Sequence, residues 1–298
     1  MPLNLEDKLV IGVSSRALFD LESENEIFEK EGLEAYSQYQ VKHENDILKP
    51  GTAFPLIKSL QKLNADGRYL TEILVMSKNS ADTSLRIFNS IDHYKLNISR
   101  AALVGGASIS PYLTAFKTDL FLSANETDVQ EAINANIASG IICDHSELPI
   151  NTEDDIEQIR IAFDGDAVIF SDESEKIYQE KGLQAFAEHE HENAKKPLPE
   201  GPFAKLLKTI SIIQSKFPAD KVPIRTSLVT ARNAPAHERV VRTLRAWNVR
   251  IDEVFFLGGI EKSDVLKAFG ANIFFDDQTA HTDPASKKVP SARVPYRN

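Results

Sequence analysis

The residues best suited to chemistry are two aspartates that follow an apolar run. Residues 161–163 have the character of a buried strand, and Asp164 and Asp166 come directly after them, with Gly165 between. On an extended chain, side chains at positions i and i+2 point to the same side. Two such carboxylates can hold a divalent cation, or one can attack an electrophile while the other transfers protons. Because pairs of this kind are common, their meaning depends on the groups downstream.

Polar groups suited to phosphate follow three further apolar segments. A threonine ends residues 226–230, a lysine follows residues 254–259, and an acid pair begins at the end of residues 272–276. Open α/β sheets bind ligands at the carboxyl ends of their strands, and amides at a helix start can hold an anion. Singly, each group is explained as a helix cap, a surface lysine or a loop. Their order indicates one site, formed by Asp164, Asp166, Thr230, Ala231, Arg232, Lys262, Asp276 and Asp277.

The elements that must position these residues occur twice in the chain. Residues 11–60 align with residues 161–210 without a gap, and after a small insertion the match continues through four expected strands. We interpret this pattern as an ancient duplication, with copies in residues 1–150 and 151–298. Apolar strands that alternate with helical stretches predict an α/β fold, with parallel sheets covered on both faces. Strands are expected at residues 9–14, 72–77, 101–106, 119–123, 160–164, 226–230, 254–259 and 272–276.

A long insertion is expected in the second copy. About sixty residues separate its first two strands, far more than in an ordinary connection. Residues 171–192 and 203–213 have helical patterns, with three prolines between them, so we expect a helical cap at roughly 171–222. The acidic residues 151–157 are expected to link the copies, and the chain after Gln278 is expected to be irregular.

The first copy lacks the acids and the lysine of the second. Ser14 and Arg16 stand where the second copy has its first acid pair, and only the hydroxyl of the threonine is retained, as Ser77. Without carboxylates there is neither a carboxylate nucleophile nor a metal site, so we expect chemistry in the second copy. The first copy is then a structural half. Alternatively, it keeps an anion pocket of Arg16, Ser77 and Lys78 for an effector.

Composition limits the class of protein. The 298 residues are 42% hydrophobic and 26% charged, as in ordinary globular proteins, and the formal net charge is −10. This charge argues against nonspecific binding to nucleic acid, which is a polyanion. No apolar run approaches the roughly 20 residues of a membrane helix, and the N-terminus lacks signal-peptide features. Cys143 is the only cysteine, which excludes an intrachain disulfide. We therefore expect a cytoplasmic protein with no membrane or nucleic-acid partner.

The order of groups in the second copy resembles that of the haloacid dehalogenase-like phosphohydrolases. The resemblance implies a Rossmann-like fold with a cap and a role for each matching residue. Asp164 would attack phosphorus to give an aspartyl-phosphate, and Asp166 would protonate the leaving group and then activate water. Thr230 and Lys262 would bind phosphoryl oxygens, with Ala231 and Arg232 as further substrate contacts; a guanidinium suits phosphate or ribose oxygens. Mg²⁺ would be bound by Asp164, Asp166, Asp276 and Asp277.

Longer motifs narrow the resemblance to the cytosolic 5'-nucleotidase type I family. They are FDGDAV (163–168), TARNAPAHER (230–239), FFLGG (255–259), FFDDQ (274–278) and VPY (294–296). The similarity extends from about residue 8 to residue 296. It implies hydrolysis of a nucleoside 5'-monophosphate, with AMP a natural candidate. It leaves a nucleotide effector and a homo-oligomeric state open.

The substrate contacts beyond the phosphate are expected in the cap. In phosphohydrolases of this kind a cap covers the site and selects the leaving group, so Tyr178, Phe186 or Phe203 is expected to contact a nucleobase. Aromatic residues at helical spacing are also common in a core. Two other interpretations of the chain remain. One is a phosphatase or phosphotransferase for another small phosphate ester, and the other is a nucleotide-binding regulatory protein without turnover. Asp166 favours catalysis, because a sensor does not need a proton-transfer group.

Overall fold

Strands and helices alternate along the chain in the computed structural model, which describes residues 4–65, 67–143, 156–233 and 236–297. The first half supplies strands β1 (Leu9–Val13), β2 (Thr71–Ser77), β3 (Arg100–Leu103), β4 (Leu120–Ser123) and β5 (Ala138–Ile142). Its helices are α1 (Ser15–Leu18), α2 (Glu22–Glu31), α3 (Leu33–Lys42), α4 (Phe54–Gln61), α5 (Leu85–His93), α6 (Ser110–Ala115) and α7 (Glu126–Asn134), with a 3-10 turn η1 (Lys62–Asn64).

The second half has a similar set of elements. Its strands are β6 (Ile159–Phe163), β7 (Ile224–Thr230), β8 (Glu253–Phe256), β9 (Ile273–Asp276) and β10 (Ser291–Arg293). Its helices are α8 (Glu173–Glu192), α9 (Ala204–Gln214), α10 (His237–Ala246), α11 (Ser263–Phe269) and α12 (Thr279–Ser286). An irregular turn, η2 (Gly165–Ile169), follows β6.

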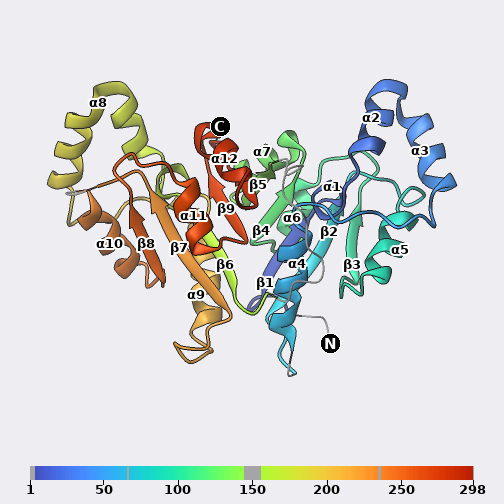
Figure 1. Ribbon diagram of the computed structural model, residues 1–298, viewed down its shortest axis with the longest axis horizontal. Coiled ribbons are helices and arrows are strands. Elements are labelled where there is room, and N and C mark those ends of the chain that lie inside the picture. Colours follow the sequence, from blue (N-terminus) through green and yellow to red (C-terminus); the bar gives the residue numbers. More distant parts are fainter. Residues whose placement is uncertain (1–3, 66, 144–155, 234–235, 298) are drawn as a thin grey trace.

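The ten strands of the described residues belong to one sheet, in the order β3-β2-β1-β4-β5-β10-β9-β6-β7-β8 (Figure 1). Neighbouring strands are parallel except β5 and β10, which pair antiparallel where the halves meet. Read outward from this junction, the strand order of the second half repeats that of the first. Strands β1 and β2 are buried along their whole length, as expected for a sheet covered on both faces. The α/β fold class predicted from the sequence is therefore confirmed.

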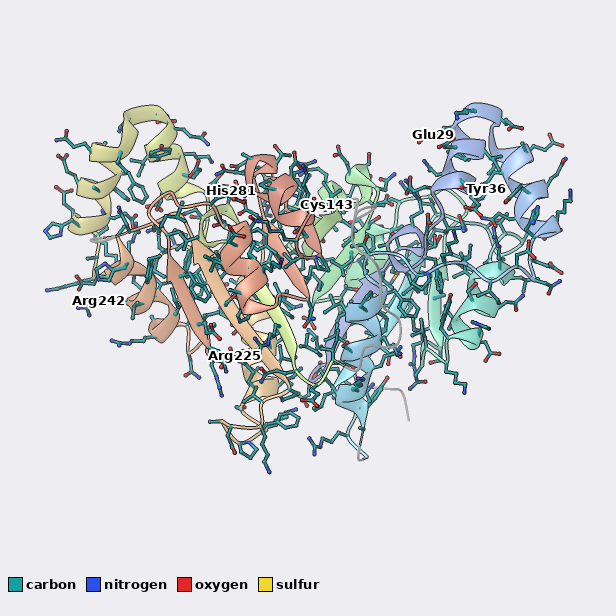
Figure 2. The ribbon with its side chains drawn as sticks, viewed as in Figure 1. Glu29, Tyr36, Cys143, Arg225, Arg242 and His281 are labelled. Carbon is teal, nitrogen blue, oxygen red and sulfur yellow. The ribbon has the colours of Figure 1, made fainter. Side chains whose placement is uncertain are left out.

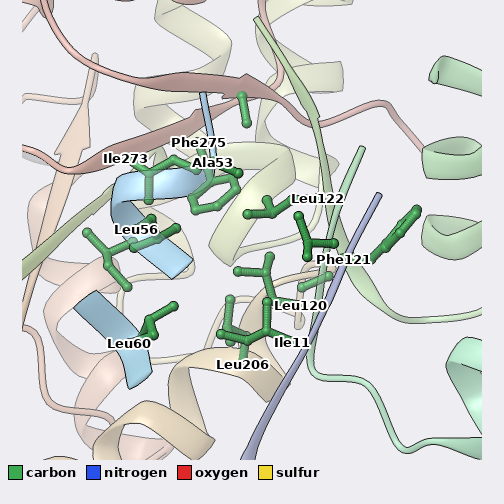
Figure 3. Packing of buried hydrophobic residues seen from close by; sticks show 14 of the residues in the cluster. Ile11, Ala53, Leu56, Leu60, Leu120, Phe121, Leu122, Leu206, Ile273 and Phe275 are labelled. Carbon is green, nitrogen blue, oxygen red and sulfur yellow. The ribbon is translucent and has the colours of Figure 1, made fainter. Parts of the chain in front are cut away.

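The two halves share one hydrophobic core. Helix α4 of the first half packs against β6 of the second, and α9 of the second half packs against β1 of the first. Leu56 and Leu60 of α4 and Leu206 of α9 are each no more than 1% exposed, and they lie among residues of both halves (Figure 3). Burial of a leucine side chain contributes about 1.5–3 kcal/mol. Each half therefore buries apolar surface that would be exposed if it stood alone.

The eight strands expected from the sequence are present, with bounds that differ by one to three residues. Two strands were not expected: β5 and β10. At Gly140 in β5, a Cβ atom would lie 2.8 Å from the Cβ of Ala292 in β10 and 3.0 Å from the ring of Phe275. The glycine therefore allows the close approach at which the halves join.

The expectation of an irregular tail after Gln278 is wrong. Residues 279–286 form α12, and Ser291–Arg293 forms β10 between β5 and β9. A strand of three residues is too short to give a pattern in the sequence, and β10 is held by pairing with both neighbours. The expected linker at residues 151–157 lies outside the described residues except for its last two.

The insertion between β6 and β7 divides into two parts of different kind. Helix α8 projects at one end of the sheet, where it bends at Gly182, which has a φ of 79° (Figure 1). Helix α9 instead lies on the sheet, with Leu206, Leu207 and Ile210 buried. Of the two helices expected in the cap at roughly 171–222, only α8 projects from the body of the protein.

Candidate active site

Three carboxylates meet at the carboxyl ends of β6 and β9. These strands are parallel neighbours with Phe163 opposite Phe275, so the residues that follow lie side by side. Asp164 follows β6, and its backbone N–H donates to the carbonyl oxygen of Phe275 at 2.8 Å. Asp276 ends β9, and Asp277 comes next. All three aspartates are buried, and one oxygen from each lies within 4.8 Å of the others.

Lys262 lies between two of these acids. Its Nζ is 2.5 Å from Oδ1 of Asp164 and 2.6 Å from Oδ2 of Asp276. The residue is 3% exposed and immediately precedes α11, so it is a fixed internal cation rather than a surface lysine. Burial opposes the charge, but the two carboxylates outweigh it and raise the pKa of Lys262 above its usual value.

The three acids differ in how readily they ionise. Burial raises the pKa of Asp164 to about 7; the charges of Asp276 and Asp166 add to this effect, and Lys262 opposes it. Burial also raises the pKa of Asp277 to about 8, with further repulsion from Asp164 and Asp276. Burial acts on Asp276 in the same direction, but Lys262 and His281 prevail and hold its pKa below the usual value.

His281 supports Asp276 from α12 (labelled in Figure 2). Its Nδ1 lies 3.1 Å from both carboxylate oxygens of Asp276. The backbone N–H of Gln278 also donates to Oδ1 of Asp276, at 2.9 Å. The position of Asp276 is therefore set by the lysine, the histidine and the start of α12.

A divalent cation fits this cluster. Carboxylate oxygens are the ligands that Mg²⁺ and Ca²⁺ prefer in proteins. Lys262 pairs with two of the three buried carboxylates, so the ionised cluster carries more negative than positive charge. A cation would neutralise that excess. Asp166, expected as a fourth ligand, is not in the cluster.

The carboxylate of Asp166 is held by Arg232. Nε and Nη2 of Arg232 donate to the two oxygens of Asp166 at 2.8 and 2.6 Å. Nη1 donates to the buried Glu190 of α8, which also accepts from Arg239 at 2.8 Å. The guanidinium lies 5.3 Å from the ring centre of Phe186. Arg232, expected to contact substrate, is thus 4% exposed and joins Asp166 to helix α8.

Thr230 stands at the end of β7, beside the turn that carries Asp164. A Cβ atom on Gly165 would be 3.4 Å from its hydroxyl oxygen. The same oxygen accepts from the backbone N–H of Arg232 at 3.2 Å, across Ala231. Because β7 is the parallel neighbour of β6, Thr230 lies at the same edge of the sheet as Asp164. The order of these groups in the sequence predicted this arrangement.

Phe203 was predicted to contact the substrate, but its buried position does not agree with that prediction. The residue has no exposed surface, and its ring packs at 4.8 Å from that of Phe275 and 6.1 Å from that of Phe163. It supports the strands that carry the acids. Phe186 is 9% exposed beneath Arg232, whereas Tyr178 is 48% exposed on α8.

In the first half, the charged side chains at the positions that align with this site are paired with side chains of the same half. Arg16 donates to both oxygens of Glu22, at 2.9 and 3.1 Å. Nζ of Lys78 lies 2.6 Å from Asp128, and Ser77 shares a hydrogen bond with another serine. Within the described ranges, the only group of acids suited to a metal is the cluster of the second half.

Sequence reasoning missed several residues around the acids. His281 falls in the tail that was expected to be irregular, and Glu190 is one of many acids on the expected cap helix. Tyr296, part of the closing motif, donates its hydroxyl hydrogen to Oδ2 of Asp277. A buried charge such as Glu190 needs partners, and the sequence does not show which arginines supply them.

Comparison with known proteins decides the family. A family model described as 5'-nucleotidase matches residues 1–298. The chain belongs to the 5'-nucleotidase family. Human cytosolic 5'-nucleotidase 1B is 41% identical over 298 residues, which covers 96% of this chain and 48% of that protein. The chain thus spans about half the length of this curated relative.

A solved structure from Pseudomonas aeruginosa UCBPP-PA14, described as a universal stress protein, also aligns with the chain. Its TM-score is 0.34 at 8% identity, covering 82% of this chain and 88% of that one. A likeness of this degree carries no argument about fold or function. Among the described residues, no helix of this family member is long and apolar enough to cross a membrane.

Proposed function

We propose that this 5'-nucleotidase family member is a Mg²⁺-dependent phosphomonoesterase that hydrolyses nucleoside 5'-monophosphates, AMP among them. The observation that carries the proposal is the meeting of Asp164, Asp276 and Asp277, with Lys262 between the first two. Buried acids with a fixed cation suit a reaction in which an anionic phosphoryl group is positioned and its charge neutralised. Family membership supports a nucleoside monophosphate as the substrate.

Asp164 is the proposed nucleophile. Its carboxylate attacks phosphorus, the bond to the 5' oxygen breaks, and an aspartyl-phosphate forms. A carboxylate reacts only when ionised, and contact with Lys262 favours that form. The lysine and the hydroxyl of Thr230 would bind phosphoryl oxygens. When bound, Mg²⁺ would be held by Asp164, Asp276 and Asp277 and would supply positive charge opposite the phosphoryl group.

Asp166 is the proposed proton-transfer group. It protonates the leaving 5' oxygen and then removes a proton from the water that hydrolyses the aspartyl-phosphate. Arg232 fixes its carboxylate through two hydrogen bonds, and Arg232 and the Ala231 amide are the further proposed substrate contacts. A metal contact by Asp166 would need its carboxylate to turn away from Arg232.

The test is phosphate release from a panel of monophosphates, with and without Mg²⁺. Asp164→Asn should abolish turnover, whereas the exposed Asp264→Asn, of the same chemistry, should leave it unchanged. Turnover that persists in Asp164→Asn would eliminate the aspartyl-phosphate. Wild-type activity on sugar phosphates but not on nucleotides would favour the alternative phosphatase, and binding without any turnover would favour a regulatory protein.

The two halves are proposed to be copies of one ancestral unit, with the catalytic copy in residues 151–298 and the non-catalytic copy in residues 1–150. The repeated strand order supports this. A nucleotide effector site in the first copy would use Arg16, Lys78 and Ser77 and would need to displace their present partners. Arg16→Ala, assayed with and without added nucleoside diphosphate, tests it; an unchanged response would remove the effector site. Cytoplasmic location and a homo-oligomeric state belong to the same proposal.

A further inference from the structure

Near the end of the chain, Tyr296 contacts the acid cluster. The hydroxyl of Tyr296 donates to Oδ2 of Asp277, which is 6% exposed. Asp277 thereby has one oxygen engaged by the tyrosine, and its other oxygen can face Asp164 and Asp276. Lys262 and His281 donate to Asp276 rather than to Asp277, so in the described part of the chain Tyr296 is the side chain that restrains Asp277.

The position of Tyr296 is set from the other half of the protein. Its carbonyl oxygen accepts from Nε2 of Gln130 on α7 at 2.8 Å. On either side, Arg293 pairs with Glu126 at 2.8 Å and Arg297 donates to Asn136 at 2.6 Å. Strand β10, just before it, pairs with β5 of the first half and β9 of the second. Residues 293–297 accordingly lie beside α7, near the mark C in Figure 1.

We propose that Tyr296 is a positioning residue for the divalent-cation site, which orients the Asp277 carboxylate from an anchor on α7. The inference rests on the proposed function, because it concerns the cation assigned there. A carboxylate that is restrained before the cation arrives loses less freedom on binding, and hydrogen-bond partners of metal ligands typically change metal affinity by 10–100-fold. The non-catalytic half thus contributes to the metal site by holding Tyr296 in place.

The test is Mg²⁺ binding by calorimetry to the full chain, with no substrate present. Tyr296→Phe removes only the hydroxyl, and the dissociation constant should rise about tenfold or more. Tyr112→Phe is the matched control, because that ring is 44% exposed on α6. Thermal unfolding in EDTA should give the same midpoint for both variants and wild type, which separates positioning from a general loss of fold.

A double-mutant cycle with Asp277→Asn identifies the route of the effect. If Tyr296 acts through Asp277, Tyr296→Phe should not weaken Mg²⁺ binding further in the Asp277→Asn background. An equal loss in both backgrounds, or a Tyr296→Phe protein that binds Mg²⁺ as wild type does, overturns the inference. A wild type that binds Mg²⁺ but hydrolyses no nucleotide refutes the proposed activity alone, and one that binds no Mg²⁺ refutes both.

Discussion

Binding of Mg²⁺ should displace protons from the acid cluster. The pKa of Asp164 is about 7 and that of Asp277 about 8, so both carboxyls carry protons at pH 6. Metal ligands must be deprotonated, and metal binding therefore releases their protons. With these two pKa values, about two protons should leave at pH 6 and about a quarter of a proton at pH 8.5. The apparent affinity should rise nearly a thousandfold over that range, or about 4 kcal/mol.

Calorimetry in buffers of different ionisation enthalpy measures both quantities. The observed heat should depend on the buffer at pH 6 and become nearly independent of it at pH 8.5. In Asp277→Asn, whose amide has no proton to lose, the release at pH 6 should fall by about one proton. A dissociation constant that is the same at pH 6 and pH 8.5, with no dependence on buffer, would refute the reasoning. It would mean that the acids are ionised before the metal binds.

Three further perturbations test the contacts that support the site. Arg232→Ala leaves Asp166 and the buried Glu190 without their shared cation, so urea unfolding should show a loss of about 3–5 kcal/mol, and a loss below about 1 kcal/mol would contradict the buried pairing. Gly140→Val places atoms inside the contact with β10 and should cost about 1–3 kcal/mol in the same assay; a neutral result would mean that the halves can separate there. An isolated fragment 151–298 should show no cooperative thermal transition by circular dichroism, because α4 of the first half covers β6; a fragment that melts cooperatively would contradict the shared core.

The strands and the main acids could be predicted because their determinants are local. An apolar run with polar residues at its end marks a buried strand, and parallel strands bring their carboxyl ends to one edge. That logic correctly placed Asp164, Thr230, Lys262 and Asp276 together. It also predicted a repeat, with which the strand order of the sheet agrees.

The missed features depend on contacts between distant segments. Strand β10 has three residues and is defined by pairing with β5 and β9, which no local pattern shows. Phe203 was expected at the substrate because it begins a helix of the insertion, but α9 lies on the sheet and turns the ring into the core. Arg232 has the chemistry of an anion-binding residue, and only the fold shows that its anions are Asp166 and Glu190.

The central claim is that four distant segments form one cation site facing one phosphorus atom. A crystal structure with Mg²⁺ and beryllium fluoride tests it most directly, since that adduct mimics a phosphorylated carboxylate. We predict beryllium bonded to a carboxylate oxygen of Asp164, Lys262 and Thr230 against the fluorides, and Mg²⁺ bound by Asp164 with Asp276 or Asp277. An adduct on another residue, or a Mg²⁺ ion that Asp164 does not contact, would contradict the account.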